Sequence, residues 1–555
     1  MNASRTWTIV VSTFGLLIPA AAVAADDAEP SARRELVVAA RYLHLPVKTG
    51  AAKRRMRFEV GGATVREFEI ELADGPPDFW AFADVSGFRG KRLTITVDAP
   101  PAELASLAAI DQGDGLKGEP VYREAHRPQF HFTSRRGWLN DPNGLVYFAG
   151  EYHLFYQHNP YGWDWGNMHW GHAVSPDLVH WRELPIALYP RRFGDWAFSG
   201  SAVVDAKNTA GFRTGDEPAL VAAYTSTGRG ECIALSRDRG RTWTEYAGNP
   251  VVTHLGRDPR VFWHEPTRRW VMAVYDEHEG KRWIAFYTAA DLVHWEFRSR
   301  IEGFYECPDL FELPVTGAPG STRWVLSAAD GRYLLGDFDG REFHPESGKH
   351  QLWHGQFYAA QTYGAEPGGR RIQVGWGKGI AFPGMPFNQQ MTVPCALTLR
   401  TTEDGVRLCA EPVAELASVR GRRHHWQDRT IRPGENLLAG LAGDLVEVVA
   451  ELDLGDAEAV GFTLRGVPVT YDGAKKTIAC GSVTAPLRPR DGAVRLRILV
   501  DRGSIEVFGN DGRVALSAGV TPPDADHSLG LFARGGAARV RSLEVFELSS
   551  AWPGP

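Results

Sequence analysis

One carboxylate in this sequence stands in a run of residues that favours a tight turn. Asp141 lies within residues 138–144, Trp-Leu-Asn-Asp-Pro-Asn-Gly, and an apolar run begins directly afterwards at Leu145. Asn, Asp, Pro and Gly favour tight or left-handed backbone, so no helix continues through this segment. A carboxylate fixed on a turn beside a strand is positioned by the backbone, which suits a nucleophile. Taken alone, such a run is more often a solvated turn, so its interpretation depends on what accompanies it.

Two further carboxyl groups offer the contrasting environments that splitting a glycosidic bond requires. Asp258 follows Arg257, whose guanidinium is expected to hold the carboxylate ionised. Glu306 stands among mostly apolar neighbours in residues 305–310, which should disfavour its charge. Such a pair supplies the acid and the nucleophile of a glycosidase. In isolation, Arg257 with Asp258 fits a structural ion pair equally well, and Glu306 fits a solvated loop residue.

Side chains suited to binding a sugar occur around these motifs. Aromatic faces stack on the C–H surfaces of sugars, and Asn, Gln and Ser bond their hydroxyls. The candidates are Gln157, Trp163, Trp165, Trp170, residues 198–201 with Phe198 and Ser199, and Trp376. Considered alone, each is more often a core or strand-edge residue. Their occurrence together with the three carboxyls is what indicates a sugar-binding site.

The elements that must position these groups are strands. Short alternating runs dominate, which predicts a mostly β chain. Asp177-Leu-Val-His-Trp181 recurs as Asp291-Leu-Val-His-Trp295, with related turn-and-aromatic units ending at Trp243 and Phe343. A repeat of about 50 to 60 residues with several strands per unit suits the blades of a β-propeller, about five of them in residues 121–415. A coincidence of similar hairpins is the alternative.

The remaining segments predict two smaller β modules. Alternating runs in residues 35–99 fit a small β-sandwich, for which we expect a module at 33–115, and Pro100-Pro101 and the Gly/Asp-rich residues 111–119 are expected to act as a linker. Residues 425–550 alternate cleanly and contain few tryptophans, which predicts a C-terminal β-sandwich. The predicted fold class is therefore all-β: an N-terminal sandwich module, a five-bladed propeller and a C-terminal sandwich.

Composition and the N-terminus limit the partners and the location. The chain has 555 residues and a net charge of -6, without a basic stripe, which argues against a nucleic-acid or anionic-membrane partner. Residues 1–25 have the pattern of a secretory signal, with a positive start, a short apolar core and a small-residue cleavage site. We therefore expect an exported protein, periplasmic or extracellular, that is not inserted in a membrane after cleavage. Its five cysteines form neither a metal pattern nor a disulfide framework.

Six motifs resemble, in sequence order, those of glycoside hydrolase family 32, the family of invertases, inulinases and levanases. They are residues 138–144, 155–160 (Phe-Tyr-Gln-His-Asn-Pro), 170–172 (Trp-Gly-His), 198–201 (Phe-Ser-Gly-Ser), 257–259 (Arg-Asp-Pro) and 306–309 (Glu-Cys-Pro-Asp). Residues 501–508 look like the hallmark of the family's C-terminal sandwich. The resemblance covers about residues 121–545 and implies a five-bladed propeller followed by that sandwich.

The resemblance also implies a role for each matching residue. Asp141 matches the nucleophile, Glu306 the general acid/base, and Asp258 a stabiliser of the fructosyl transition state with Arg257 beside it. Cys307 would lie next to the acid, where tuning its proton affinity and simple packing are equally open roles. The matching positions of the fructose subsite are Asn140, Gln157, Trp165, Phe198 and Ser199, with Trp376 a less certain member. Configuration is retained if Asp141 and Glu306 lie about 5–5.5 Å apart.

The expected function is a retaining β-fructosidase acting on levan or inulin, with sucrose as a lesser substrate. Two carboxyls and water suffice, so we expect neither a metal nor another cofactor. A fructosyltransferase would share every residue named. A glycosidase for arabinan or xylan, and a non-catalytic fructan-binding protein, are more distant alternatives. The choice between exo and endo cleavage, the preferred linkage, the oligomeric state and the role of the N-terminal module, either carbohydrate binding or packing support, stay open.

Overall fold

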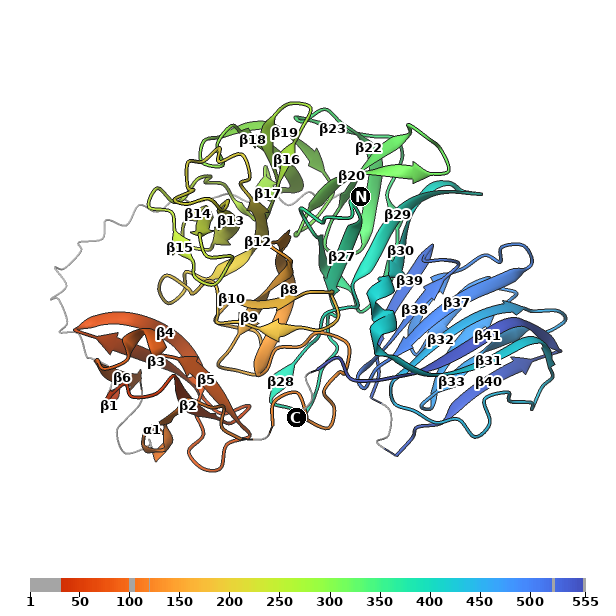
Figure 1. Cartoon of the computed structure of the whole chain (residues 1–555), viewed down its shortest axis with the longest axis horizontal. Helices are drawn as coiled ribbons and strands as arrows, with labels where there is room; N and C mark the ends of the chain where they lie inside the picture. Colours follow the sequence, from red (N-terminus) through yellow and green to blue (C-terminus); the bar gives the residue numbers. More distant parts are fainter. Residues whose placement is uncertain (1–30, 99–104, 119, 522–524, 553–555) are drawn as a thin grey trace, which may run out of the picture.

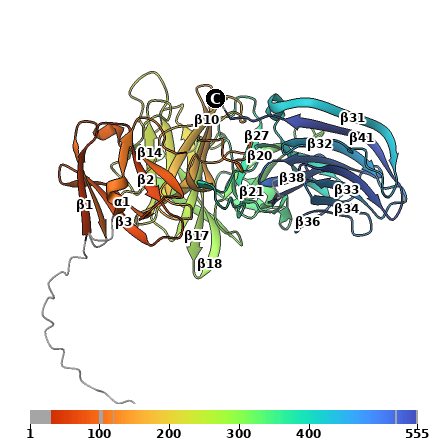
Figure 2. The ribbon, with the colours of Figure 1, turned by 90° about the horizontal axis from the view of Figure 1, so that it is seen from below.

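The computed structural model describes residues 31–98, 105–118, 120–521 and 525–552. The expected signal segment, residues 1–25, lies outside the described residues. Strands dominate the described chain, and its helices are short: α1 (Ala105–Ala109) and the 3-10 turns Ser86–Phe88 and Ala414–Val419. Figures 1 and 2 show three β bodies in a row, with the propeller between an N-terminal and a C-terminal sandwich. The predicted all-β class is confirmed.

The N-terminal module packs two small antiparallel sheets around its own apolar core. One sheet has the order β1-β6-β3-β4 and the other β5-β2-β7. Residues such as Leu43, Phe58 and Ile95 are fully buried between them. The strands are β1 (Ser31–Val37), β2 (Tyr42–Val47), β3 (Lys53–Val60), β4 (Ala63–Glu71), β5 (Phe79–Asp84), β6 (Arg92–Asp98) and β7 (Asp111–Gly113).

Five antiparallel blades form the propeller, each with its first strand innermost. The blades are β8 (Gly137–Phe148), β9 (Glu151–Asn159), β10 (His169–Ser175) and β11 (Arg182–Glu183); β12 (Ala197–Val204), β13 (Leu220–Ser226), β14 (Gly230–Ser236) and β15 (Thr244–Glu245); β16 (Gly256–His264), β17 (Arg269–His278), β18 (Lys281–Ala289) and β19 (Trp295–Glu302); β20 (Asp309–Thr316), β21 (Thr322–Ser327), β22 (Arg332–Phe338) and β23 (Phe343–Pro345); and β26 (Tyr358–Thr362), β27 (Arg371–Trp376), β29 (Cys395–Thr402) and β30 (Gly405–Pro412).

The repeated Asp-turn-Trp motif closes the outer hairpin of a blade in the same way each time. Asp177 accepts hydrogen bonds from the next turn's amides, and the Trp181 indole donates to the carbonyl of Leu178 at 3.1 Å. Asp291 and Trp295 repeat both contacts, with the indole bond at 3.0 Å. The sequence repeat therefore marks equivalent corners of the first and third blades, as expected for a propeller.

The ring is closed by pairing between distant parts of the chain. The short strand β28 (Phe387–Asn388) pairs in parallel with the start of β8 at Gly137. The backbone of Gly364, just after β26, exchanges hydrogen bonds with Leu145 and Tyr147 of β8. The first and last blades are thus joined, and the inner strands are held around a common axis.

The C-terminal sandwich is attached to the propeller by shared strands and a buried carboxylate. Its small strand β25 (Trp353–Gly355) comes from between the fourth and fifth blades and pairs in parallel with β39. Asp501 is fully buried and accepts bonds from the amides of Gln129 and Phe130 and from the ring of His131. The two sheets contain β31 (Arg420–Ile431), β32 (Val446–Asp453), β37 (Ala493–Val500), β38 (Ser504–Gly509), β39 (Val514–Gly519) and β41 (Ala538–Leu548); and β33 (Ala459–Leu464), β34 (Val467–Asp472), β35 (Thr477–Cys480), β36 (Val483–Pro486) and β40 (Leu529–Arg534).

The N-terminal module docks on the propeller loop that follows β9. Phe68 stacks on Tyr161 with ring centroids 3.6 Å apart. The side chain of Asn167, which is buried, bonds the backbone N–H and carbonyl of Glu69 in β4 at 2.9 and 2.8 Å. It therefore continues the edge of the module's sheet as a backbone would. No helix among the described residues is long and apolar enough to cross a membrane.

Candidate active site

Irregular backbone at the start of the inner strands is the feature that builds the site. The pairing register shifts near the beginning of β8, β12, β16 and β26. Before β20 the chain takes a positive φ at two successive non-glycine residues, Glu306 and Cys307. Bulges turn side chains out of the regular alternation, and they concentrate next to active sites. Here they direct side chains from all five blades toward one end of the propeller axis.

Asp141 lies within β8, not in a separate turn beside a strand as the sequence suggested. The turn-forming residues produce two bulges against β9, one on each side of Pro142 and Asn143. The carboxylate accepts hydrogen bonds from Ser199 Oγ at 2.6 Å and from Asn140 Nδ2 at 3.0 Å. Two neutral donors on one carboxylate fix its direction without neutralising it. That is the environment of a positioned nucleophile.

Asp258 occupies a strained position in the first strand of the third blade. Its φ is +70°, and it lies in the bulge between Arg257 and Arg260. The carboxylate is almost fully buried and accepts a bond from the amide of Cys307 at 3.1 Å. The Cys307 thiol lies 3.5 Å from Asp258 Oδ2 and 3.6 Å from Asp141 Oδ2. One thiol therefore bridges the two aspartates.

Glu306 is more accessible than Asp258. Its side chain is 21% exposed, compared with 4% for Asp258. Oε1 accepts a bond from Arg257 Nη2 at 2.5 Å, and Oε2 accepts one from the Tyr358 hydroxyl at 2.8 Å. The group faces the open side of the site, which is where a leaving group would depart.

The charges of the three carboxyls differ from the expectation drawn from sequence. Burial and the neighbouring Asp141 charge raise the pKa of Asp258 to about 8, because Arg257 lies 3.9 Å away and only partly offsets them. Burial also raises the pKa of Asp141. Burial acts to raise the pKa of Glu306 as well, but the bonds from Arg257 and Tyr358 outweigh it and lower the value. The expectation that Arg257 holds Asp258 ionised was therefore wrong, and so was that of a charge-disfavouring Glu306 environment.

The strained backbone at Asp258 is fixed from behind by a buried polar network. Thr225 Oγ accepts a bond from the amide of Asp258 at 2.9 Å and donates to Glu231 at 2.8 Å. Glu231 in turn contacts Nε2 of His254 at 2.8 Å, and the other ring nitrogen faces Asp276 at 3.3 Å. Burial lowers the pKa of His254, but these two carboxylates outweigh it and raise the value. The network links four strands, β13, β14, β16 and β17, behind the site.

The remaining predicted site residues fall into a linked group and a peripheral one. Trp376 lies edge-on to Trp138, 6.0 Å between centroids, and the Trp138 indole donates to Asn140 at 2.9 Å, so both support the Asp141 partner. Gln157 is buried and donates to the carbonyl of Ala197, at the base of the Phe198 and Ser199 segment. Trp165 is 49% exposed and lies edge-on to Phe198 at 6.2 Å. It is therefore a rim residue, whereas Trp170 is completely buried.

Sequence reasoning missed Tyr358, Tyr305 and Thr225. The hydroxyls of Tyr358 and Tyr305 contact Glu306 and Arg257, respectively, and Thr225 supports Asp258. Tyr358 and Thr225 stand in no distinctive run, and Tyr305 precedes Glu306 without a pattern that marks its hydroxyl. Only the meeting of separate blades makes them relevant, so no local signal in the sequence identifies them.

The site consists of carboxyls, amides and aromatic rings. Among the described residues, no group of three or more His, Cys, Asp or Glu side chains is arranged to hold a metal ion. The arrangement offers a carboxylate held in one orientation for attack, a second carboxyl at the open side for proton transfer and a third for hydroxyl groups. These are groups that a glycosidase uses.

Comparison with protein families gives two matches that together cover most of the chain. Residues 131–412 match the description "Glycosyl hydrolases family 32 N-terminal domain", and residues 415–547 match "Glycosyl hydrolases family 32 C terminal". Both matches lie outside the N-terminal module.

Several known proteins and solved structures are also similar to this chain. The chain is 42% identical over 489 residues to a levanase of Bacillus subtilis (strain 168), covering 78% of this chain and 72% of that protein. It is 32% identical to an extracellular exo-inulinase of Aspergillus awamori, with coverage of 81% and 100%. The crystal structure of exo-inulinase from Aspergillus awamori aligns with a TM-score of 0.71 at 30% identity, covering 78% of this chain and all of that one. A fructofuranosidase from Schwanniomyces occidentalis complexed with fructosylnystose aligns with a TM-score of 0.70 at 26% identity, covering 79% and 100%.

Proposed function

Because the chain belongs to glycosyl hydrolase family 32 and is a glycosidase, we propose that it is an exported retaining β-fructosidase that cleaves levan or inulin. In this proposal Asp141 is the nucleophile, Glu306 the general acid/base and Asp258 the transition-state stabiliser. The observation that carries the proposal is the gathering of these carboxyls around Cys307 and Arg257 at one end of the axis.

The bonds to Asp141 suit an attack on the anomeric carbon of a fructofuranosyl unit. Ser199 and Asn140 hold the carboxylate in one orientation, which lowers the entropic part of the barrier. Attack forms a covalent fructosyl–enzyme ester as the bond to the leaving oxygen breaks and Glu306 donates its proton to that oxygen. Glu306 then removes a proton from water, which attacks the ester and restores Asp141 with retained configuration.

The raised pKa of Asp258 suggests how the acid obtains its proton. Near neutral pH in the free enzyme, Asp258 holds a proton that burial keeps on it, and Arg257 keeps Glu306 ionised. Sugar hydroxyls that donate to Asp258 favour its charged form. Substrate binding would therefore release the proton of Asp258. Glu306, which is more accessible than Asp258, would receive it. The proton then lies where the leaving oxygen departs.

The substrate class and export rest on the relatives and on the sequence. The names of the relatives specify levan and inulin as substrates for those proteins, and one of them is extracellular. Residues 1–25 have the secretory pattern described above. We extend both properties to this chain and divide it as expected: a module at 33–115, the catalytic propeller at 121–415 and the sandwich at 425–550.

Product analysis tests the proposal directly. The purified protein is incubated with levan, inulin and sucrose in parallel, and the products are separated by chromatography. Fructose from levan or inulin is the expected result, with fructose alone indicating exo cleavage and a ladder of oligosaccharides indicating endo cleavage. Longer oligosaccharides formed from concentrated sucrose would indicate a transferase instead, and inactivity on all three substrates would contradict the proposal.

A further inference from the structure

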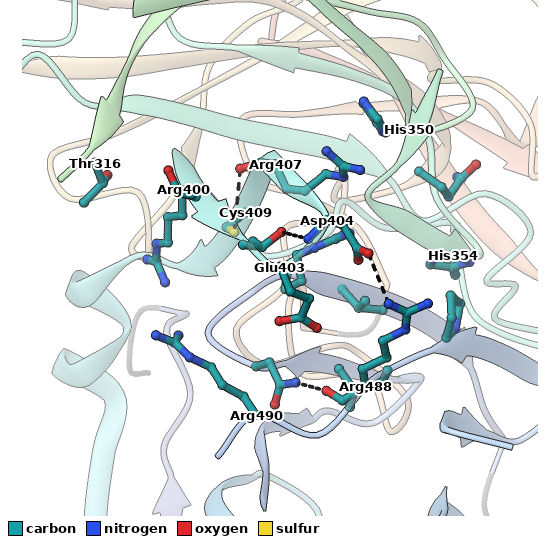
Figure 3. Close-up of a pocket in the computed structure, with 18 of the residues that line it drawn as sticks. Thr316, His350, His354, Arg400, Glu403, Asp404, Arg407, Cys409, Arg488 and Arg490 are labelled. Carbon is teal, nitrogen blue, oxygen red and sulfur yellow. Dashed lines mark hydrogen bonds and ion pairs between the residues drawn. The ribbon is translucent and has the colours of Figure 1, made fainter. Parts of the chain in front are cut away.

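A second cavity lies between the propeller and the C-terminal sandwich, far from the three carboxyls. Its volume is about 760 Å³, within the range of small-molecule sites. The propeller contributes Thr316 at the end of β20 and the hairpin between β29 and β30, and the sandwich contributes residues 486–490 and 510–514 (Figure 3). Strand β20 starts three residues after Glu306 and ends at this cavity, so it separates the two places by about 25 Å.

Cationic side chains predominate around this cavity. Its lining includes Glu403 and Asp404 as acidic residues, together with six cationic ones: Lys349, Arg400, Arg407, Arg488, Arg490 and Arg513. Figure 3 shows that these come from both sides, with Arg400 and Arg407 on the propeller and Arg488 and Arg490 on the sandwich. The whole chain carries a net charge of -6, so this concentration of positive charge is a local property.

Ion pairs compensate only part of this charge. Arg488 and Arg513 share Asp404, at 3.1 and 3.7 Å. Arg400 pairs with Glu411, and Arg490 lies 3.5 Å from Asp511. Among the described residues, by contrast, Arg407 and Lys349 form no ion pair with any carboxylate.

The two uncompensated cations are held by neutral groups. Arg407 donates to the carbonyl of Val406 at 2.8 Å, and Lys349 donates to the carbonyl of Gly303. Burial and, to a smaller extent, the charges of Arg407 and Arg513 lower the pKa of His350 on the cavity wall. The remaining donors of Arg407 form a planar fork that matches a phosphate or a carboxylate.

The lining also differs from that of a neutral-sugar site. No Phe, Tyr or Trp occurs among the described residues that line the cavity. The catalytic pocket, in contrast, has Trp376, Trp138 and Tyr358 around its carboxyls. A neutral fructan would therefore find no aromatic face here, whereas an anion would find several charged donors in a partly shielded space.

We propose that this cavity is a binding site for an anionic ligand whose phosphate or carboxylate oxygens bind Arg407 and its neighbours. Two sources share this chemistry: a free oxyanion, and an acidic oligosaccharide with carboxylates on its rings. The second would fill the cavity more completely. The site is independent of the fructosidase reaction, because the propeller separates it from the catalytic carboxyls.

Calorimetric titration of the full chain distinguishes these sources. Inorganic phosphate serves as the free oxyanion, trigalacturonate as the acidic oligosaccharide, and maltotriose as a neutral sugar with the same number of rings. We expect one or both anions to bind, with affinity that decreases as salt increases, and maltotriose not to bind. Phosphate alone would identify an oxyanion site, and tighter binding of trigalacturonate would identify an oligosaccharide site.

Arg407→Gln tests whether the binding occurs in this cavity. Loss of a charge-assisted hydrogen bond should weaken anion binding by about tenfold or more. Arg429→Gln, on an exposed part of β31, is the matched control and should bind like wild type. Unchanged fructan hydrolysis by Arg407→Gln would show that the variant is folded. Absence of anion binding by the wild type, or equal binding by Arg407→Gln, would overturn the proposal.

Discussion

Arg257 donates its hydrogen bond to Glu306, at 2.5 Å, although Asp258 is its neighbour in sequence. The positive φ of Asp258 turns the two adjacent side chains in different directions, so the guanidinium crosses to the next blade. The bond from Arg257 therefore helps to lower the pKa of Glu306, whereas burial and the Asp141 charge raise the pKa of Asp258.

Arg257→Gln should move the activity profile toward higher pH. Arg257 lowers the pKa of Glu306, so its removal raises that pKa and keeps the acid protonated to a higher pH. A shift of about one to two pH units in the alkaline limb of kcat/KM is expected, alongside any loss of activity. Arg282→Gln is the control, because Arg282 lies over the Tyr305 ring without bonding Glu306. An unshifted limb would contradict this account of the acid.

Glu306→Gln should abolish most turnover and preserve binding. The amide keeps the shape of the side chain but transfers no proton, so kcat should fall by about 10²- to 10⁴-fold. The affinity for a fructo-oligosaccharide, measured by titration, should remain near that of the wild type. Glu302→Gln, an exposed glutamate four residues earlier, serves as the control. Near-normal turnover by Glu306→Gln would remove it from the acid/base role.

Thr225→Val should damage catalysis through the backbone of Asp258. Valine has the shape of threonine but leaves the Asp258 amide and Glu231 without their shared partner. The resulting unsatisfied groups should lower kcat/KM by about tenfold or more. Thr225→Ser restores the hydroxyl and should recover most of the activity. If Thr225→Ser were as impaired as Thr225→Val, the methyl group and not the hydroxyl would be important.

Asn167→Ala should raise KM with little change in kcat. The side chain joins the N-terminal module to the loop that carries Trp165, two residues earlier. Without these bonds, the rim aromatic loses its support while the carboxyls keep their positions. An increase of several-fold in KM for levan or inulin is expected, on the order of 1 kcal/mol in binding. Asn208→Ala is the control, since Asn208 also has left-handed backbone but lies in another loop. Equal KM values for both variants would show that the module does not influence the substrate.

The attachment of the C-terminal sandwich should weaken in alkali. Burial acts to lower the pKa of His131, but Asp501 and Glu506 outweigh it and raise the value to about 9. Its stabilising contribution is therefore complete below the ordinary histidine value of about 6.5 and is lost as the pH rises through about 9. The unfolding temperature, measured by calorimetry, should fall over this interval in the wild type. His131→Asn should be less stable at neutral pH and lack the step, whereas His425→Asn, an exposed control, should retain it. Persistence of the step in His131→Asn would assign it to other groups.

The sequence predicted which carboxyls form the candidate site better than it predicted their charges. Asp141, Asp258 and Glu306 each stand in a short run with distinctive turn chemistry, so local patterns identified them. Their protonation depends on partners from other blades, such as Tyr358. It also depends on the direction of the Arg257 side chain, which the strained backbone at Asp258 helps to set. Those relationships arise only when the ring closes. The repeat of Asp177 and Trp181 predicted the propeller for a similar local reason, because each copy closes its own hairpin.

The closure of the ring also sets the order in which the protein matures. Strand β8 carries Asp141, yet the start of β8 is completed by β28, about 250 residues later in the chain. A nascent chain that does not yet include β28 has no finished pocket. The enzyme therefore remains inert throughout most of its synthesis. If it crosses the membrane unfolded, as expected from the N-terminal segment, its hydrolytic capacity appears only after the chain has emerged on the far side at least as far as β28, which ends at residue 388 of 555.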